Sequence, residues 1–218
     1  MEYIFVGLLL AFLLFLFLDA KRRAANLQRH INEERKAIAE ASNMTASIGV
    51  FYPDGQSTVI MGASEEMGAL YYRMLRGDRL INRTKINLAN IIRVELLLNS
   101  MPHPFESESS QPTSTLKSTD IANQVLASIS QEALQGIQKA ALRILFFSET
   151  GTEKSLEITS FRVGDERYRF KRTQMIKNSI WWVAFLNLAS RHVRHASHHL
   201  QNLAEDQPLA APPPPPAG

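Results

Sequence analysis

The sequence contains no cysteine, and this absence removes several classes of function at once. A chain without thiols forms no disulfide, has no thiol nucleophile and offers no Cys-ligated zinc site. The sequence also lacks the short motifs of common active sites, namely G-x-S-x-G, H-E-x-x-H and a Gly-rich phosphate loop. We therefore predict that the protein is not an enzyme and that it uses no cofactor.

A strong excess of charge of either sign is also missing. The chain has 24 basic and 21 acidic residues, a formal net charge of +3, although its sequence pI is near 9.3. Binding to nucleic acid needs clustered cations that face phosphates, so this small excess predicts no nucleic-acid partner. Hydrophobic residues form 45% of the 218 residues, which suits a folded core and excludes a wholly disordered protein.

The longest apolar run lies at the N-terminus, where Tyr3–Leu18 consists of apolar residues dominated by Leu and Phe. As a helix, these sixteen residues rise about 24 Å, a little less than the roughly 30 Å hydrocarbon core of a bilayer. Flanking residues, including the stems of the basic residues that follow, can cover the difference. The run therefore predicts one transmembrane helix within residues 1–20, with the lipid bilayer as a partner.

The charges around this run predict its orientation. Lys21, Arg22 and Arg23 follow the run directly, and no basic residue precedes it. By the positive-inside rule we expect a single-pass protein of the inner (plasma) membrane, with its N-terminus outside and its folded domain in the cytoplasm. A cleaved signal peptide is the alternative, but Glu2 stands where a basic n-region is expected and no small-x-small cleavage site follows the run.

Residues 21–45 are predicted to form a helical stalk. Leu27, Ile31, Glu34 and Ile38 recur at alternating spacings of four and three residues, as the a and d positions of a coiled coil do. Glu34 interrupts the apolar seam. Two interpretations stay open at this point: a solvated stalk with one apolar stripe, or a short coil through which two copies form a homodimer.

Period-two alternation replaces the helical pattern from Ala46 onward. Ile92, Val94 and Leu96 alternate with more polar neighbours, as in a half-buried strand. Turn residues such as Pro, Asp and Gly at positions 53–55 separate successive runs. The pattern predicts an antiparallel meander and then a second group of strands, at residues 47–52, 57–61, 69–75, 80–86, 91–98, 142–147 and 155–161.

Helices and two flexible segments complete the predicted outline. Residues 101–119 are rich in Pro, Ser, Glu and Thr, which predicts a flexible insertion. An inserted helix is expected at residues 120–135, and a long amphipathic helix at residues 173–203. The Pro-rich tail at residues 204–218 predicts exposed, disordered chain with polyproline II character.

Two segments resemble the pleckstrin-homology-like (PH-like) domains of uncharacterised bacterial membrane-anchored proteins. The sequence NLANIIRVEL at residues 87–96 is similar to their polar loop and alternating strand, and IWWVAFL at residues 180–186 to the helix that caps their open barrel. The resemblance implies an α+β fold, an antiparallel β-barrel or sandwich over residues 46–203 that the C-terminal helix closes. Such domains bind phosphoinositides, peptides or proteins, so the resemblance implies binding without naming a ligand.

Basic residues occur in both groups of predicted strands and before the last helix. Neighbouring strands can bring them onto one face that meets a protein partner or anionic lipid headgroups, where each cation is worth about 1 kcal/mol. The alternative is a set of ordinary exposed positions whose charges protect strand edges. The candidate patch consists of Arg73, Arg83, Lys85, Arg93, Arg167, Arg169, Lys171 and Arg172.

Three histidines share one face of the predicted C-terminal helix. His192, His195 and His199 stand at i, i+3 and i+7, a spacing at which imidazoles can hold a transition metal. Neighbouring arginines would repel a cation, and no carboxylate lies close in sequence. We therefore predict a polar, solvated helix end without a metal, and keep these residues only as weak candidate ligands.

These observations predict a membrane-anchored module that holds a protein or lipid partner at the cytoplasmic surface. The alternative is a structural subunit of a membrane complex, in which the N-terminal helix and the stalk make the contacts and the domain at residues 46–203 is a scaffold.

Overall fold

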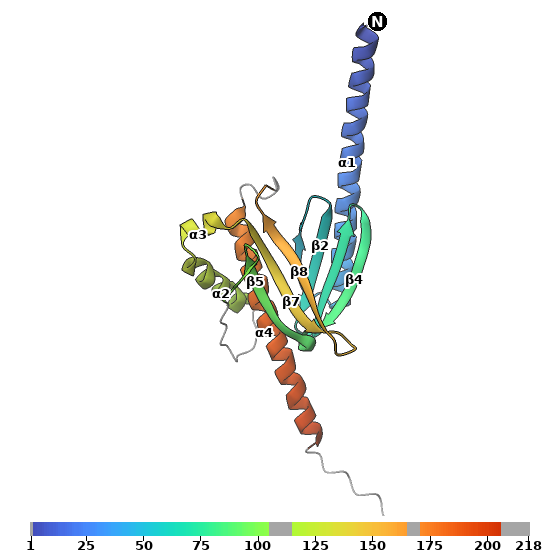
Figure 1. Ribbon diagram of the computed structural model, residues 1–218. Coiled ribbons are helices and arrows are strands. Elements are labelled where there is room, and N and C mark those ends of the chain that lie inside the picture. The colour runs from blue at the N-terminus through green and yellow to red at the C-terminus, as the bar shows by residue number, and fades with distance from the viewer. Residues whose placement is uncertain (1, 105–114, 165–170, 206–218) are drawn as a thin grey trace, which may run out of the picture.

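The computed structural model describes residues 2–104, 115–164 and 171–205 and shows an α+β protein with two antiparallel sheets (Figure 1). Its helices are α1 (Glu2–Ala41), α2 (Thr115–Ser128), α3 (Gln131–Gly136) and α4 (Arg172–Glu205), and the 3-10 turn η1 spans Leu88–Asn90. Its strands are β1 (Ser47–Phe51), β2 (Ser57–Ser64), β3 (Ala69–Arg76), β4 (Arg79–Asn87), β5 (Ile91–Leu98), β6 (Met101–His103), β7 (Lys139–Phe147) and β8 (Glu153–Arg162).

Both sheets have four strands, in the orders β1-β2-β3-β4 and β6-β5-β7-β8. The first is the predicted meander, in which consecutive strands pair. The second brings β5 beside β7 although α2 and α3 lie between them in sequence. The predicted strands and their antiparallel arrangement are therefore confirmed. The register of β3 and β4 slips next to Met74, which leaves Ile81 as an extra, bulged residue.

The main core lies between the two sheets and is closed by α4. Ile180, Val183 and Leu186 of α4 are fully buried with the inward-facing residues of both sheets. Trp182 lies against β1 at Gly49, where an added Cβ would stand 2.8 Å from the indole Nε1. Only glycine leaves room for this ring, so the close packing of α4 on the first sheet depends on that residue. The long C-terminal helix is confirmed.

The inserted helical segment differs from its prediction. Residues 120–135 were expected to form one helix, whereas the structure has α2, which begins at Thr115, and α3. Ser130 separates the two helices, because its side chain accepts a hydrogen bond from the Ala133 backbone N–H and caps α3. Within the predicted flexible insertion at 101–119, residues 101–103 form β6, and residues 105–114 lie outside the described residues, as does the tail from 206 onward.

The predicted stalk is not a separate segment. Helix α1 is continuous over 40 residues, and its second half packs on the outer face of the first sheet (Figure 1). Ile31 and Ile38 are buried there against Ile60 and Tyr71, while Gly62 of β2 receives the Ile38 side chain directly. The Tyr71 hydroxyl also donates a 2.8 Å hydrogen bond to the Ala41 carbonyl at the end of the helix. The apolar stripe of the predicted stalk is therefore covered by the protein's own sheet.

The prediction of a transmembrane anchor is wrong. In the part of the chain that the structure describes, no helix combines the length and the apolar character that crossing a membrane requires. The predicted single-pass location in the inner membrane depends on this anchor and is therefore not supported. The same holds for the predicted orientation, with the N-terminus outside and the folded domain in the cytoplasm.

Candidate functional site

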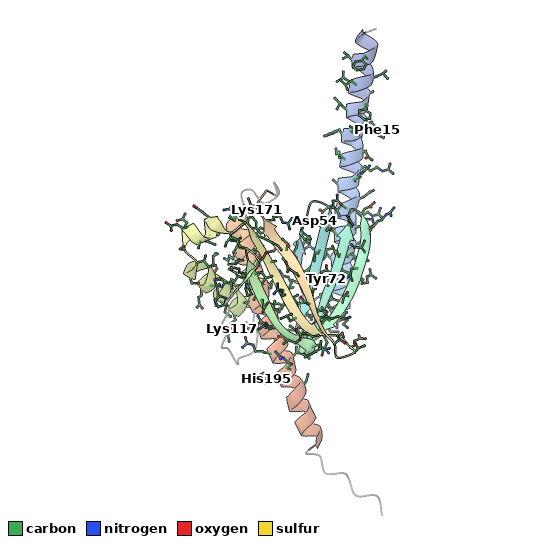
Figure 2. All side chains as sticks on the ribbon, viewed as in Figure 1. Phe15, Asp54, Tyr72, Lys117, Lys171 and His195 are labelled. Atoms are coloured by element: carbon green, nitrogen blue, oxygen red, sulfur yellow. The ribbon has the colours of Figure 1, made fainter. Side chains whose placement is uncertain are left out.

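The first half of α1 carries the most exposed apolar surface that the structure describes. It projects beyond the folded head at one end, whereas the end of α4 projects at the other (Figure 1). Its side chains, Phe15 among them, point away from the helix axis and meet no other element of the described residues (Figure 2). The exposed fractions run from 46% at Leu16 to 70% at Phe5. The exposed large apolar residues are Phe5, Val6, Leu8, Leu9, Leu10, Phe12, Leu13, Leu14, Phe15, Leu16, Phe17 and Leu18, which we call the apolar segment.

The second half of α1 is attached to the sheet by a cluster of charges. Glu34 faces Arg73 of β3, with 3.2 Å between Arg73 Nε and Glu34 Oε2, and Arg83 of β4, with 2.8 Å between Arg83 Nη2 and Glu34 Oε1. The contact with Arg83 is a hydrogen bond, whereas the Arg73 Nε–Glu34 Oε2 contact is an ion pair without hydrogen-bond alignment. Glu34 thus neutralises a buried arginine, although in the sequence it interrupts the apolar a and d positions of the helix.

Burial is the main influence on Arg73. It lowers the pKa of the guanidinium, the neighbouring Arg83 lowers the pKa further, and Glu34 raises it again. Arg73 Nη1 also donates to the carbonyl oxygens of Tyr72 and Thr84, at 3.0 and 3.2 Å. In some proteins a buried ion pair of this kind specifies one alignment of two elements and adds little stability. We therefore interpret the cluster as the contact that sets where α1 lies along the sheet.

The residues of the candidate basic patch do not form one surface. Arg73, Arg83 and Lys85 lie together on the α1-facing side of the first sheet, where Lys85 Nζ stands 5.8 Å from the centre of the Tyr71 ring. Arg93 is on the second sheet and pairs with Glu95 at 2.8 Å. Lipid or partner binding by the set stays a prediction.

The remaining members of the patch lie around the start of α4. Lys171 precedes the helix (Figure 2), and Arg172 donates to the Gln135 carbonyl at 2.8 Å. The guanidinium of Arg172 also lies 5.7 Å from the centre of the Phe161 ring. Arg167 and Arg169 are outside the described residues.

The histidine face of α4 is not assembled into a metal centre among the side chains that the structure describes, which hold no group of three metal-ligating residues. His192 Nδ1 is hydrogen-bonded to the carboxylate of Glu65 in the β2–β3 loop. His195 lies further along the helix (Figure 2). The side chain of His199 is outside the described part. His192 thus ties α4 to the first sheet.

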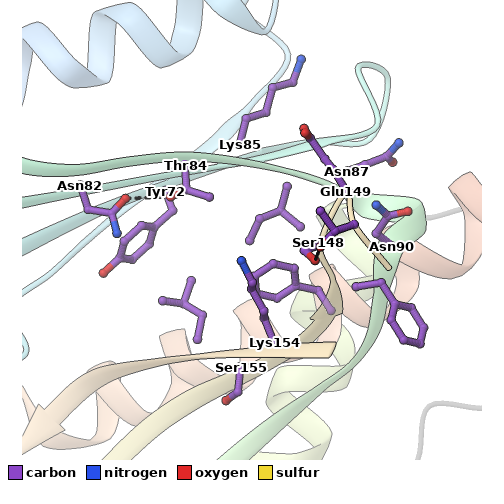
Figure 3. A pocket seen from close by; sticks show the side chains of 15 residues that line it. Tyr72, Asn82, Thr84, Lys85, Asn87, Asn90, Ser148, Glu149, Lys154 and Ser155 are labelled. Carbon is purple, nitrogen blue, oxygen red and sulfur yellow. Dashed lines mark hydrogen bonds between the residues drawn. The ribbon is translucent and has the colours of Figure 1, made fainter. Parts of the chain in front are cut away.

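A cavity opens between β4 and the hairpin of β7 and β8 (Figure 3). Its volume is about 480 Å³. Tyr72 and Thr84 reach it from the first sheet, and Lys154 points into it from β8 (Figure 3). The other lining residues are Asn82, Lys85, Ile86, Asn87, Asn90, Phe146, Phe147, Ser148, Glu149, Thr150, Ser155 and Leu156.

The cavity wall combines aromatic surface with hydrogen-bonding groups. Burial raises the pKa of the Tyr72 hydroxyl, which therefore stays protonated and donates to Met74 Sδ at 3.4 Å. Thr84 donates to the Asn82 side-chain oxygen at 2.7 Å, which orients that amide at the edge of the cavity. A site with apolar walls and a few polar groups suits a side chain or a small molecule that has one apolar part.

No family model, curated protein or solved structure matches this chain. The PH-like resemblance therefore stays a prediction. The features that bear on function are the apolar segment, the charge cluster on α1 and the cavity. The sequence predicts the first of these, although as a membrane span, and it indicates the charged residues without their partners. No local pattern predicts the cavity, because the cavity forms where strands far apart in sequence meet.

Proposed function

We propose that the protein is a non-catalytic assembly subunit. Its apolar segment packs among apolar helices of a protein partner, and α1 holds the folded head at a fixed position beside that partner. The observation that carries this proposal is the continuous exposure of large apolar side chains from Phe5 to Leu18. A monomeric soluble protein rarely exposes a contiguous apolar surface of this kind, and such surfaces mark interaction sites.

The shape of the apolar segment indicates what kind of partner fits it. Successive helical residues are about 100° apart, and consecutive positions such as Phe12, Leu13, Leu14 and Phe15 are all apolar and exposed. The surface therefore covers the whole circumference. One partner helix would cover only one side, as in a two-stranded coil, so the partner must supply apolar helices on several sides.

The attachment of α1 to the head supports a positioning role. The same helix is apolar on all sides at one end and packed on the first sheet at the other. Because the helix is continuous, the orientation of the apolar segment is transmitted to the head without a linker. The Glu34 cluster joins α1 to β3 and β4 through Arg73 and Arg83. A subunit that only needed a tether would not require this rigid connection.

The proposal is tested by isolating the tagged full chain from cells under native conditions and weighing the complex by native mass spectrometry. We expect a stoichiometric protein partner that Leu13→Glu releases, because a charge within the apolar contact is costly. Lys36→Glu, at an exposed polar position of the same helix, is the matched control and should retain the partner. A full chain that carries only phospholipid, or that is free of any partner, would overturn the proposal.

A further inference from the structure

The sheet edges of the head differ in how they are covered. Strand β1 lies beside β8, so these two edges face each other. The short β6 covers part of β5, and the Asn187 side chain of α4 both accepts from the Val94 N–H, at 2.9 Å, and donates to the Val94 carbonyl, at 2.8 Å. Backbone groups that β6 leaves uncovered are thus satisfied by a side chain.

Strand β4 is a longer edge strand than β6, with nine residues against three. Within the described residues it pairs with β3 alone, and it ends the first sheet. Seven of its nine residues are exposed, including the apolar Leu80 at 39% and Ile81 at 53%. The bulge at Ile81 interrupts the regular backbone, so the regular part of this open edge is Asn82–Asn87. An edge strand of this length presents alternate N–H and C=O groups to any extended chain beside it.

The two sides of this edge have different chemistry. Residues that pair across strands share a face, so Arg83 and Lys85 lie on the same side as Arg73 and Tyr71, the side that faces α1. Asn82, Thr84 and Ile86 lie on the opposite side and line the cavity, together with Phe146 and Leu156 of the second sheet (Figure 3). Lys85 also borders the cavity, but its side chain points away from it (Figure 3). One side of the edge is basic and the other opens into a partly apolar pocket.

We propose that β4 binds an extended peptide of a partner protein as an added strand, with acidic and apolar residues in alternation. Because successive side chains of a strand point to opposite faces, every second residue of such a peptide would enter the cavity. The others would meet Lys85 and Arg83, whose guanidinium also pairs with Glu34 of α1. The same two cations disfavour pairing with the β4 edge of a second copy, because like charges directly opposite each other repel.

This inference is independent of the proposed role of the apolar segment, since the two surfaces lie on different elements. The probe is a capped octapeptide of alternating leucine and glutamate, added to the full chain held in nonionic detergent. Binding is measured by fluorescence anisotropy, and hydrogen exchange locates it. We expect slowed exchange of amides within Asn82–Asn87, and at least about tenfold weaker binding of the matched leucine–lysine peptide.

Two further comparisons make the test decisive. Lys85→Glu changes an exposed side chain and should reverse the preference between the two peptides. A leucine–glutamate peptide whose pairing N–H groups are methylated should lose binding to every variant, because it cannot form the strand hydrogen bonds. Absence of binding, unchanged exchange in β4, or equal binding of the methylated peptide would overturn the proposal.

Discussion

The two halves of α1 consist of the same kind of helix but have opposite environments. From Phe5 to Leu18 the large apolar side chains are exposed, whereas Ile31 and Ile38 are 3% and 0% exposed. Hydrophobicity alone does not explain the difference, since both halves contain large aliphatic residues. The spacing of those residues explains it. Apolar residues that lie on one side of a helix can be covered by one sheet, whereas apolar residues on all sides cannot.

This difference also explains where charges are tolerated. In the second half, Glu34 lies within the buried contact because Arg73 and Arg83 meet it there. In the apolar segment no charged residue occurs between Phe5 and Leu18. A partner that encloses this segment can therefore be wholly apolar, whereas the sheet that receives the second half must supply arginines at set positions. The following predictions test that contrast, from the largest expected effect to the smallest.

Removing the carboxylate that α1 inserts into the sheet should have the largest effect. Glu34→Ala leaves Arg73 buried without its counter-charge, which we expect to lower the free energy of unfolding by about 3 kcal/mol. Urea unfolding followed by the fluorescence of Trp181 and Trp182 measures this value. The double variant Glu34→Leu with Arg73→Leu should recover most of the loss, because no charge is then left buried. A loss below about 0.5 kcal/mol for Glu34→Ala would show that the helix is not held by this pair.

The close contact between α1 and β2 predicts the next effect. A Cβ on Gly62 would collide with the Ile38 side chain, so Gly62→Ala should cost about 1–3 kcal/mol by overpacking. In the Gly62→Ala variant, the rate of hydrogen exchange should rise more in residues 27–41 than in the strands. Adding Ile38→Ala should compensate in part and give a measurable coupling energy. Strictly additive effects of the two substitutions would contradict direct contact between these residues.

The hairpin beneath α1 should respond to acid. Partial burial raises the pKa of Asp54, but hydrogen bonds from the Gln56 and Ser57 N–H groups, at 2.7 and 2.5 Å, lower it more, so its pKa lies below its usual value of 3.8. The carboxylate's stabilising effect is therefore complete above that unfolded-state value and is lost as pH falls through the folded-state pKa. Asp54→Ala should cost about 1 kcal/mol at pH 7. Equal losses at pH 7 and pH 2, measured by urea unfolding, would contradict this assignment.

The smallest effect is expected where α4 meets the β2–β3 loop, away from α1. Glu65→Gln removes the carboxylate that pairs with His192, and the side chains of both residues are partly exposed. Such pairs contribute about 0–1 kcal/mol, so the free energy of unfolding should change by less than 1 kcal/mol. The packing of α1 on the sheet should not change, so the rate of amide hydrogen exchange in residues 27–41 should stay the same. A change there would mean that the two helices are coupled through the sheet.

Local patterns predicted most of the fold but little of the candidate site. Strands such as β5 and the long α4 follow from alternation and helical spacing, both of which depend on residues close in sequence. The partners of Glu34 lie 39 and 49 residues further along the chain, and nothing in the helix itself identifies them. The cavity likewise joins Tyr72 of β3 to Lys154 of β8. The error over the apolar segment arose because composition predicts an apolar environment without saying which one.

The most direct test of the account is photo-cross-linking of the apolar segment in cells. A photoreactive residue at Phe12 and another at Leu14 report on faces of α1 about 200° apart, and the same probe at Lys36 serves as the control on the polar face. The account predicts protein adducts from both Phe12 and Leu14, on apolar helices of the same partner, and none from Lys36. Adducts with phospholipid alone at both positions, or no adducts, would contradict it.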